Sequence, residues 1–210
     1  MPHGSTWRPP TQTPSCSQGG VLCLQPSCHT SGMNKSELRA SVRAKRKLMA
    51  DPVNVARMVQ HAAELPAGQV VALYHAIGSE MPTTELAQAL EAQGRTVCLP
   101  VVVARDAPMI FRLWTLGDPL EEDIAGCPAP LDLASEVLPD LVITPLVAFD
   151  AKGYRLGQGG GYYDRTLAQR PEMVRIGLAF AGQEVDAVPY EAHDIRLHGV
   201  LTENGYRATS

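Results

Sequence analysis

Helical and extended hydrophobic patterns alternate along the chain from residue 34 onward. Residues 34–49 carry apolar side chains at helical spacing behind a capping box formed by Asn34 and Glu37. Residues 69–77 and 95–103 are continuous apolar stretches, which are typical of strands buried on both faces. Further helices are expected over 52–65, 83–94 and 162–169, and further strands over 109–114, 140–149, 174–180 and 198–204. This order predicts an α/β fold, a Rossmann-like three-layer sandwich whose central sheet is mostly parallel.

The first 32 residues lack this alternation. They are rich in Pro, Ser, Thr and Gly and contain one charged residue, Arg8. We therefore expect a disordered or non-native extension over 1–32 and a single α/β domain over 33–210. The extension is interpreted as sequence translated from too early a start, with Met33 as the functional beginning. Its three cysteines fit no common zinc template: Cys16, Cys23 and Cys28.

Charge and composition restrict the partners of the chain. A formal net charge of -4 gives no global reason to expect nucleic acid or an anionic membrane surface. No apolar run approaches the roughly 18 to 20 residues that span a bilayer. Cys98 and Cys127 lie far apart and suggest no disulfide framework, which favours a reducing compartment. We expect a soluble, cytoplasmic monomer that binds small molecules.

The segment GYRLGQGGGYYDRTL, residues 153–167, concentrates backbone freedom, cations and an acid. It fits neither a dinucleotide fingerprint, because Tyr162 stands where a glycine is required, nor a P-loop. Arg155 suits a phosphate, and Asp164 suits the magnesium that accompanies a nucleoside triphosphate. The alternative is a tight structural turn with Asp164 as a helix cap. Positive φ would let four glycines turn their NH groups inward around an anion: Gly157, Gly159, Gly160 and Gly161.

A basic stripe runs along the first predicted helix. Its members recur every four residues and so lie on one side of the helix: Lys35, Arg39, Arg43 and Lys47. Such a stripe is either a solvated face or, for its first members, a contact surface for a polyphosphate. The helix by itself leaves both interpretations open.

Four motifs together resemble the 5-formyltetrahydrofolate cyclo-ligase family, also called 5,10-methenyltetrahydrofolate synthetase. They are KSELR, YHAIGSEMPTTEL, FDAKGYRLGQGGGYYDRTL and VPYEAHD, in the family's order, within residues 33–210. The resemblance implies ATP- and Mg²⁺-dependent conversion of 5-formyltetrahydrofolate to 5,10-methenyltetrahydrofolate, with release of ADP and phosphate. It also implies that the formyl oxygen attacks the γ-phosphate and that N10 then closes the ring as phosphate leaves. Phosphoryl transfer of this kind needs positioning and charge neutralisation rather than a covalent nucleophile.

The resemblance assigns roles to residues that match these motifs. It implies catalytic roles for Lys35, Arg155 and Tyr162. It implies magnesium ligation by Asp164 and Asp194. Folate contacts are expected from His75, Glu80, Trp114 and Tyr162, where Trp114 offers a ring for stacking. The implied ATP contacts are Lys35, Ser36, Glu37, Leu38, Arg39, Arg155, Leu156, Gly157, Gln158, Gly159, Gly160, Gly161, Tyr162 and Tyr163.

Several of these residues also have plain structural explanations. Asp194 suits a turn, and Glu80 suits a solvated loop acid before a helix cap. His75 and Trp114 suit core positions. In favour of binding, the carboxylate of Glu80 can accept paired hydrogen bonds from the NH groups of a pterin ring. Gln158 departs from the family, which often has an aromatic or basic residue there, and we expect this to change affinity rather than reaction type.

Two other classes of function compete with the cyclo-ligase. A nucleotide-binding regulatory protein of the same fold, without folate turnover, would often lose Lys35, Glu80 or Asp164, and all three are present. A sugar-phosphate isomerase or acyl transferase on a similar sheet would need its own base or nucleophile, since fold alone does not fix function. No convincing candidate for either group is visible in the sequence.

Overall fold

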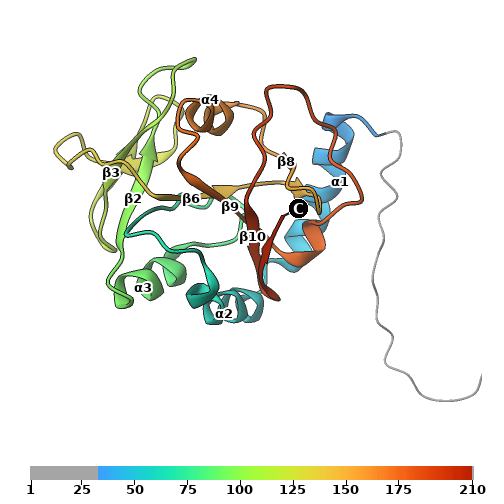
Figure 1. Cartoon of the computed structure of the whole chain (residues 1–210), viewed down its shortest axis with the longest axis horizontal. Helices are drawn as coiled ribbons and strands as arrows, with labels where there is room; N and C mark the ends of the chain where they lie inside the picture. Colours follow the sequence, from blue (N-terminus) through green and yellow to red (C-terminus); the bar gives the residue numbers. More distant parts are fainter. Residues whose placement is uncertain (1–32, 210) are drawn as a thin grey trace, which may run out of the picture.

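One seven-stranded sheet organises residues 33–209, the part of the chain that this computed structural model describes (Figure 1). The strand order is β11-β10-β9-β6-β1-β2-β3. The five inner strands are parallel, and β3 and β11 pair antiparallel at the two edges. The strands are β1 (Val70–Ala72), β2 (Thr96–Val101), β3 (Ile110–Leu113), β6 (Leu141–Pro145), β9 (Val174–Leu178), β10 (Gly199–Thr202) and β11 (Gly205–Ala208).

Helices cover both faces of this sheet. Figure 1 shows α2 (Pro52–Gln60) and α3 (Thr84–Ala92) on one side and α4 (Tyr162–Ala168) on the other. Successive side chains along a strand point to opposite faces of the sheet, so each strand can pack against the helices on both sides. Val71 packs in the cluster with α2 and α3, whereas Ala72 packs in the cluster with Leu167 of α4. The predicted three-layer α/β sandwich is confirmed.

The remaining helix, α1 (Lys35–Met49), lies beside a small second sheet. Leu38 and Val42, two of its predicted apolar positions, pack against Val147, Ala148 and Leu156. That sheet pairs β7 (Ala148–Phe149) with β8 (Arg155–Leu156). The chain also forms a hairpin of β4 (Leu120–Glu122) and β5 (Pro128–Pro130), and two short 3₁₀ helices, η1 (Ala62–Glu64) and η2 (Ala181–Gln183).

Two predicted elements differ in the structure. The strand expected over 140–149 ends as β6 at Pro145, and the chain then turns to form β7, whose Val147 N–H donates to the Leu156 carbonyl at 2.7 Å. Proline has no N–H for a sheet ladder, which fits the end of β6 there. The helix expected over 52–65 divides into α2 and η1. The hairpins β4–β5 and β10–β11 were not predicted.

The order of the parallel strands locates a crevice. β1 is followed along the chain by β2 on one side of it, and the chain then returns to place β6 on its other side. Connections therefore leave β1 and β6 in opposite directions, which opens a crevice outside the carboxyl ends of these strands. The segments that follow β1 and β6 contain His75, Glu80 and the glycine-rich residues 153–161.

The burial of side chains in the sheet core leads to a prediction about the free energy of unfolding. Ile143 of β6 is fully buried in the large core cluster. Ile143→Ala should lower the free energy of unfolding by about 2 to 5 kcal/mol, because it removes buried apolar surface and leaves a cavity. Urea denaturation measures the change. The control Leu133→Ala alters a side chain that is 96% exposed and should stay within about 0.5 kcal/mol; equal losses in both variants would contradict the assignment of this core.

Candidate active site

A cleft of about 690 Å³ lies at this crevice. The segments that line it include α1 through Lys35 and Arg39, the segment from Tyr74 to Glu80 after β1, the residues from Arg155 to Arg165, and the segment from Glu191 to Asp194. A cleft of this size suits a ligand as large as a nucleotide or a folate. The structure therefore brings residues of all four sequence motifs together in one cleft.

The glycine-rich loop forms one wall of the cleft. Gly159 and Gly161 have positive φ, +110° and +67°, and Gly161 is the N-cap of α4. Gly157 and Gly160 do not share this conformation, so the prediction of positive φ is wrong for these two. At Gly160 an added Cβ would lie 3.0 Å from the Tyr162 ring, so close packing rather than φ restricts that position. The loop is thus shaped by two left-handed residues and one crowded residue.

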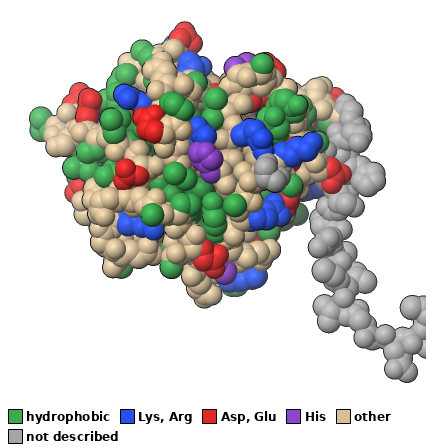
Figure 2. All heavy atoms as spheres, viewed as in Figure 1, with side chains coloured by type: hydrophobic (Ala, Val, Ile, Leu, Met, Phe, Trp, Pro, Cys, Tyr) green, Lys and Arg blue, Asp and Glu red, His purple; other side chains and the backbone are tan. Residues whose placement is uncertain are grey.

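The basic stripe of α1 faces this loop. The Arg39 Nε–H donates to the Gly157 carbonyl at 2.9 Å, and an Arg43 guanidinium N–H donates to the Gln158 side-chain oxygen. Lys47, one helical turn further on, is exposed. Figure 2 shows Lys and Arg side chains gathered on the part of this face where α1 lies in Figure 1. The first members of the stripe are therefore cleft residues rather than a solvated face.

Lys35 is held by two carboxylates from the opposite wall. Its Nζ lies 2.9 Å from Glu191 Oε1 and 2.9 Å from Asp194 Oδ2. Burial acts to lower the pKa of Lys35, but the hydrogen bonds to both carboxylates raise it overall. Burial likewise acts to raise the pKa of Asp194, but the hydrogen bonds from Lys35 and from the Glu191 N–H bring it below its usual value. The pair thus contributes stability that is lost as pH falls through the lowered pKa of Asp194 or rises through the raised pKa of Lys35.

Arg155 joins the glycine loop to the segment that carries Asp194. Its side chain is 4% exposed, and its Nη2 donates to Asp164 Oδ1 at 2.8 Å. Its Nη1 donates to the Ile195 carbonyl at 2.5 Å, and the Ile195 N–H returns a hydrogen bond to Asp164 Oδ1 at 3.1 Å. The two contacts of this guanidinium therefore hold Asp164 beside Ile195, the residue that follows Asp194.

These contacts test whether Asp164 and Asp194 suit a magnesium ion. Mg²⁺ in nucleotide sites takes one or two carboxylates, completing its shell with water and substrate phosphates. Two carboxylates on adjacent segments of one cleft match that donor set. Among residues 33–209, no cluster of three or more His, Cys, Asp or Glu side chains is arranged to hold a metal by itself. These residues therefore suit an ion that is bound together with phosphate, and they do not form a metal site from protein ligands alone.

Glu80 lies on the other side of the glycine loop and is 6% exposed. Its Oε2 accepts from the Ile77 N–H at 3.0 Å, and its Oε1 accepts from the Gln158 side-chain amide at 2.8 Å. His75 is exposed and lines the cleft beside it. Glu80 is thus a buried, hydrogen-bonded carboxylate and not the solvated loop acid of the structural alternative.

The predicted aromatic residues divide between cleft and core. Tyr162 lines the cleft, with the Arg165 guanidinium 4.8 Å above its ring. Tyr163 also lines the cleft. Its burial raises the pKa of its phenol, and the charge of Glu80 raises that pKa further. Trp114 does not line the cleft: its ring packs on the core cluster of α2 and α3, and its Nε1–H donates to the Asp118 carbonyl at 3.4 Å.

Three residues of the KSELR motif also lie away from the cleft. The Glu37 carboxylate accepts from the Asn34 N–H at 3.0 Å, and the N–H of Ser36 donates to Asn34 Oδ1 at 2.9 Å, so both residues form the cap of α1. Leu38 is fully buried in the core. Expected ATP contacts at Ser36, Glu37 and Leu38 are therefore not supported by the positions of their side chains. Lys35 and Arg39 alone of this motif line the cleft.

Arg46 is a buried residue of this region that the sequence analysis missed. Its Nε donates to Ser79 Oγ and its Nη1 to the Leu146 carbonyl, each at 3.1 Å. Burial lowers the pKa of Arg46, and the charge of Glu80 opposes that shift. Arg46 thus supports the segment that carries Glu80. The available signal was its four-residue spacing from Leu38 and Val42, the buried face of α1.

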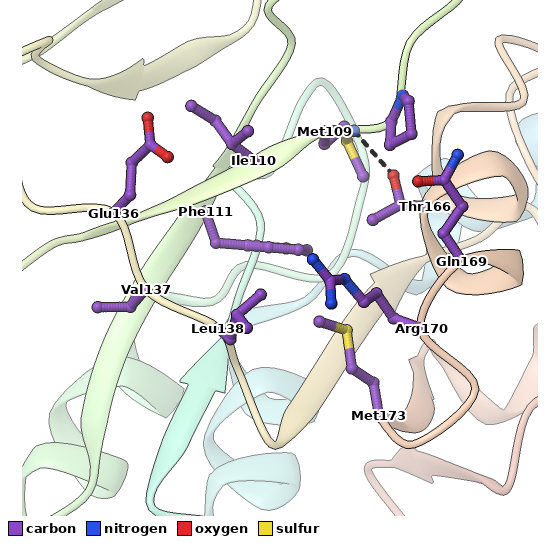
Figure 3. A pocket seen from close by; sticks show the side chains of 11 residues that line it. Met109, Ile110, Phe111, Glu136, Val137, Leu138, Thr166, Gln169, Arg170 and Met173 are labelled. Atoms are coloured by element: carbon purple, nitrogen blue, oxygen red, sulfur yellow. Dashed lines mark hydrogen bonds between the residues drawn. The ribbon is translucent and has the colours of Figure 1, made fainter.

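A second cavity of about 460 Å³ lies on the far side of α4 (Figure 3). Met109 borders both cavities, and its N–H donates to Thr166 Oγ1 at 2.9 Å. Arg170 and Met173 also line it. None of the predicted site residues lies there, so the larger cleft is the candidate active site.

A mostly parallel sheet with a glycine-lined cleft at its switch point, into which Lys35, Arg39 and Arg155 face, is typical of α/β proteins that bind phosphate-bearing ligands. The sequence profile of the 5-formyltetrahydrofolate cyclo-ligase family matches residues 31–203. The chain therefore belongs to the 5-formyltetrahydrofolate cyclo-ligase family.

Individual relatives agree with this assignment. A 5-formyltetrahydrofolate cyclo-ligase of Haemophilus influenzae is 39% identical over 138 residues, which are 62% of this chain and 74% of the relative. Its counterpart in Escherichia coli K12 is 37% identical over 139 residues, 63% of this chain and 76% of the relative. The solved 5,10-methenyltetrahydrofolate synthetase of Aquifex aeolicus matches with a TM-score of 0.70 at 30% identity, over 84% of this chain and 93% of that one. The comparisons confirm the predicted family and favour a cyclo-ligase over a binding protein without turnover.

Proposed function

We propose that this cleft converts 5-formyltetrahydrofolate to 5,10-methenyltetrahydrofolate with ATP, releasing ADP and phosphate. One observation carries the proposal: cations from separate segments, Lys35, Arg39 and Arg155, line the same cleft as the buried carboxylate of Glu80. The cations suit a triphosphate, and the carboxylate suits the NH groups of a pterin ring. The glycine loop lies between them, where the two substrates meet.

The chemistry needs positioned charge more than a nucleophilic side chain. The formyl oxygen attacks the γ-phosphorus, ADP leaves, and the formyl carbon becomes an electrophilic iminium phosphate. N10 then bonds to that carbon and loses its proton as the carbon–oxygen bond breaks and phosphate leaves. Lys35 and Arg155 stabilise the negative charge of the transferring phosphoryl group. Glu80 and Tyr162 orient the folate so that its formyl oxygen meets the phosphate.

Magnesium is proposed to bind through Asp164 and Asp194. When bound, the ion neutralises phosphate charge and fixes the conformation of the triphosphate. Lys35 and Arg155 hold these two carboxylates in the cleft: Lys35 Nζ lies 2.9 Å from Asp194 Oδ2, and Arg155 Nη2 lies 2.8 Å from Asp164 Oδ1. The same two cations turn to the phosphates when the nucleotide arrives with its ion.

The reaction itself is the first test. Purified protein with Mg²⁺, ATP and 5-formyltetrahydrofolate should produce the longer-wavelength absorbance of the methenyl product, and a sample without ATP should not. Tyr162→Phe is a useful companion variant because it retains the ring beneath Arg165 while removing the phenol oxygen. Folded protein that binds ATP but never forms the product would favour the regulatory alternative.

Lys35→Ala should raise the KM for ATP by about 10-fold or more and change the KM for folate much less, because it removes a charge-assisted contact to the polyphosphate. Steady-state kinetics with each substrate varied measures both constants. Lys47→Ala is the matched control, since Lys47 belongs to the same stripe but is exposed outside the cleft. An unchanged KM for ATP in Lys35→Ala would remove Lys35 from the proposed site.

The protein is further proposed to act on small molecules as a cytoplasmic monomer. Cys98 and Cys127 are free thiols, as a reducing compartment requires. Within residues 33–209, no helix has the length and apolar character needed to span a membrane. Light scattering coupled to size-exclusion chromatography tests the monomer directly. The three cysteines at positions 16, 23 and 28, and the extension that contains them, lie outside the described residues.

A further inference from the structure

Gln158 bridges two walls of the cleft through the two ends of its amide. The side-chain oxygen accepts from Arg43 of α1, and the side-chain NH₂ donates to Glu80 Oε1 at 2.8 Å. The residue is exposed at the apex of the glycine loop, just before Gly159 with its positive φ. One side chain therefore connects the basic helix, the nucleotide loop and the carboxylate proposed to bind folate.

This bridge occupies a position that the folate needs. Glu80 is 6% exposed, and its Oε2 already accepts the Ile77 N–H at 3.0 Å. A buried carboxylate is costly without hydrogen bonds, and the Gln158 amide satisfies its second oxygen. Because Glu80 is so little exposed, a pterin ring that donates two N–H groups to it reaches Oε1 only by displacing the Gln158 amide.

We propose that Gln158 is a coupling residue that makes folate and nucleotide binding positively cooperative. The inference rests on the proposed function, because it takes Glu80 as the folate carboxylate. With the folate position empty, Glu80 holds the Gln158 amide and the loop that carries it. When folate takes Oε1, the amide is released, and its NH₂ and the adjoining loop NH groups turn to the phosphates of ATP.

The sign of the coupling follows from linkage. Breaking the bond between Gln158 and Glu80 opposes whichever ligand binds first, and the second ligand binds to a loop that is already released. Each ligand must therefore raise the affinity of the other by the same factor. A side chain that only packs in the loop would change affinities without changing this factor.

Calorimetric titration of the full chain measures the factor without turnover. The Kd of the non-hydrolysable nucleotide AMP-PNP with Mg²⁺ is determined with and without saturating 5-formyltetrahydrofolate, and the reverse titration checks reciprocity. The unsubstituted protein should show coupling of about fivefold or more, within the usual range for linked sites. Gln158→Met keeps the length of the side chain but removes its amide, and its factor should fall close to one. Its affinity for folate alone should rise, by about threefold or more, because no hydrogen bond to Glu80 has to be broken.

Gln169→Ala is the matched control, because Gln169 is an exposed glutamine on the far side of α4 that lines the second cavity. It should retain the coupling of the unsubstituted protein. Gln158→Ala repeats the test should the methionine variant fail to fold. Intact binding of both ligands with the same coupling factor in Gln158→Met and the unsubstituted protein overturns the coupling role alone. Absence of any folate binding to the unsubstituted protein overturns the proposed function together with it.

Discussion

Replacing Glu80 with glutamine should lower kcat/KM for 5-formyltetrahydrofolate by about 10²-fold, mainly through KM for the folate. The variant keeps the size of the side chain but removes its charge and one acceptor. Loss of a charge-assisted hydrogen bond costs about 1.5 to 3 kcal/mol, and a buried ligand donor left unsatisfied costs about 1 to 3 kcal/mol. Since about 1.4 kcal/mol corresponds to a factor of ten, a loss of about 10²-fold takes the lower end of their sum. The KM for ATP should change by no more than a few-fold, because Glu80 is proposed to contact the pterin and not the nucleotide.

Glu121→Gln is the control for this experiment. Glu121 is an exposed acid of β4 outside the cleft, so the same loss of one negative charge should leave both Michaelis constants within about twofold. Circular dichroism and thermal unfolding establish that the Glu80 variant is folded. Equal weakening of ATP and folate in Glu80→Gln would count against a pterin contact and favour a general role in shaping the loop.

The order of helices and strands was predictable because each segment has a distinct hydrophobic period. The cap of α1 was equally local, since Asn34 and Glu37 are three residues apart and complete it without the rest of the chain. The β10–β11 hairpin was missed although Asn204 and Gly205 are a turn signal. Its second strand is short and partly exposed, so it has almost no hydrophobic pattern of its own.

The site was predictable to the level of segments but not of side chains. Trp114 shows why: its face depends on the register of β3, which places Phe111 toward α4 and Trp114 toward α2 and α3. A shift of one residue in the strand would have reversed this. The surroundings of Gly157 and Gly160 are likewise tertiary: the Gly157 carbonyl accepts from Arg39 of α1, and the Tyr162 ring leaves little room for a Cβ at Gly160.

Charged residues were the hardest to place. Arg46 has the spacing of the buried face of α1, and only tertiary acceptors from Ser79 and Leu146 make its burial tolerable. Glu191 also had no role before the structure, yet it pairs with Lys35 across the cleft. These partners are separated in the chain by 33, 100 and 156 residues, so no local pattern can identify them.

Arg155→Met should lower kcat/KM for ATP by about 10³-fold, mainly in kcat, because it removes a preorganised cation from the transferring phosphoryl group. It also leaves Asp164 without its ion-pair partner, 2.8 Å away, and separates the glycine loop from the Ile195 carbonyl. The guanidinium fork makes both contacts at once. Arg155→Lys should therefore recover the charge and much of the thermal stability but only part of kcat.

A matched arginine separates this chemistry from a general effect of charge. Arg170→Met removes an exposed guanidinium that lines the cavity on the other side of α4, and it should leave kcat within about twofold. Thermal unfolding of each variant accounts for any loss of folded protein. If Arg155→Met is folded and retains kcat, the transferring phosphoryl group is stabilised by Lys35 and the loop NH groups instead. If Arg155→Met and Arg155→Lys lose kcat equally, the geometry of the fork, and not its charge alone, positions the phosphate.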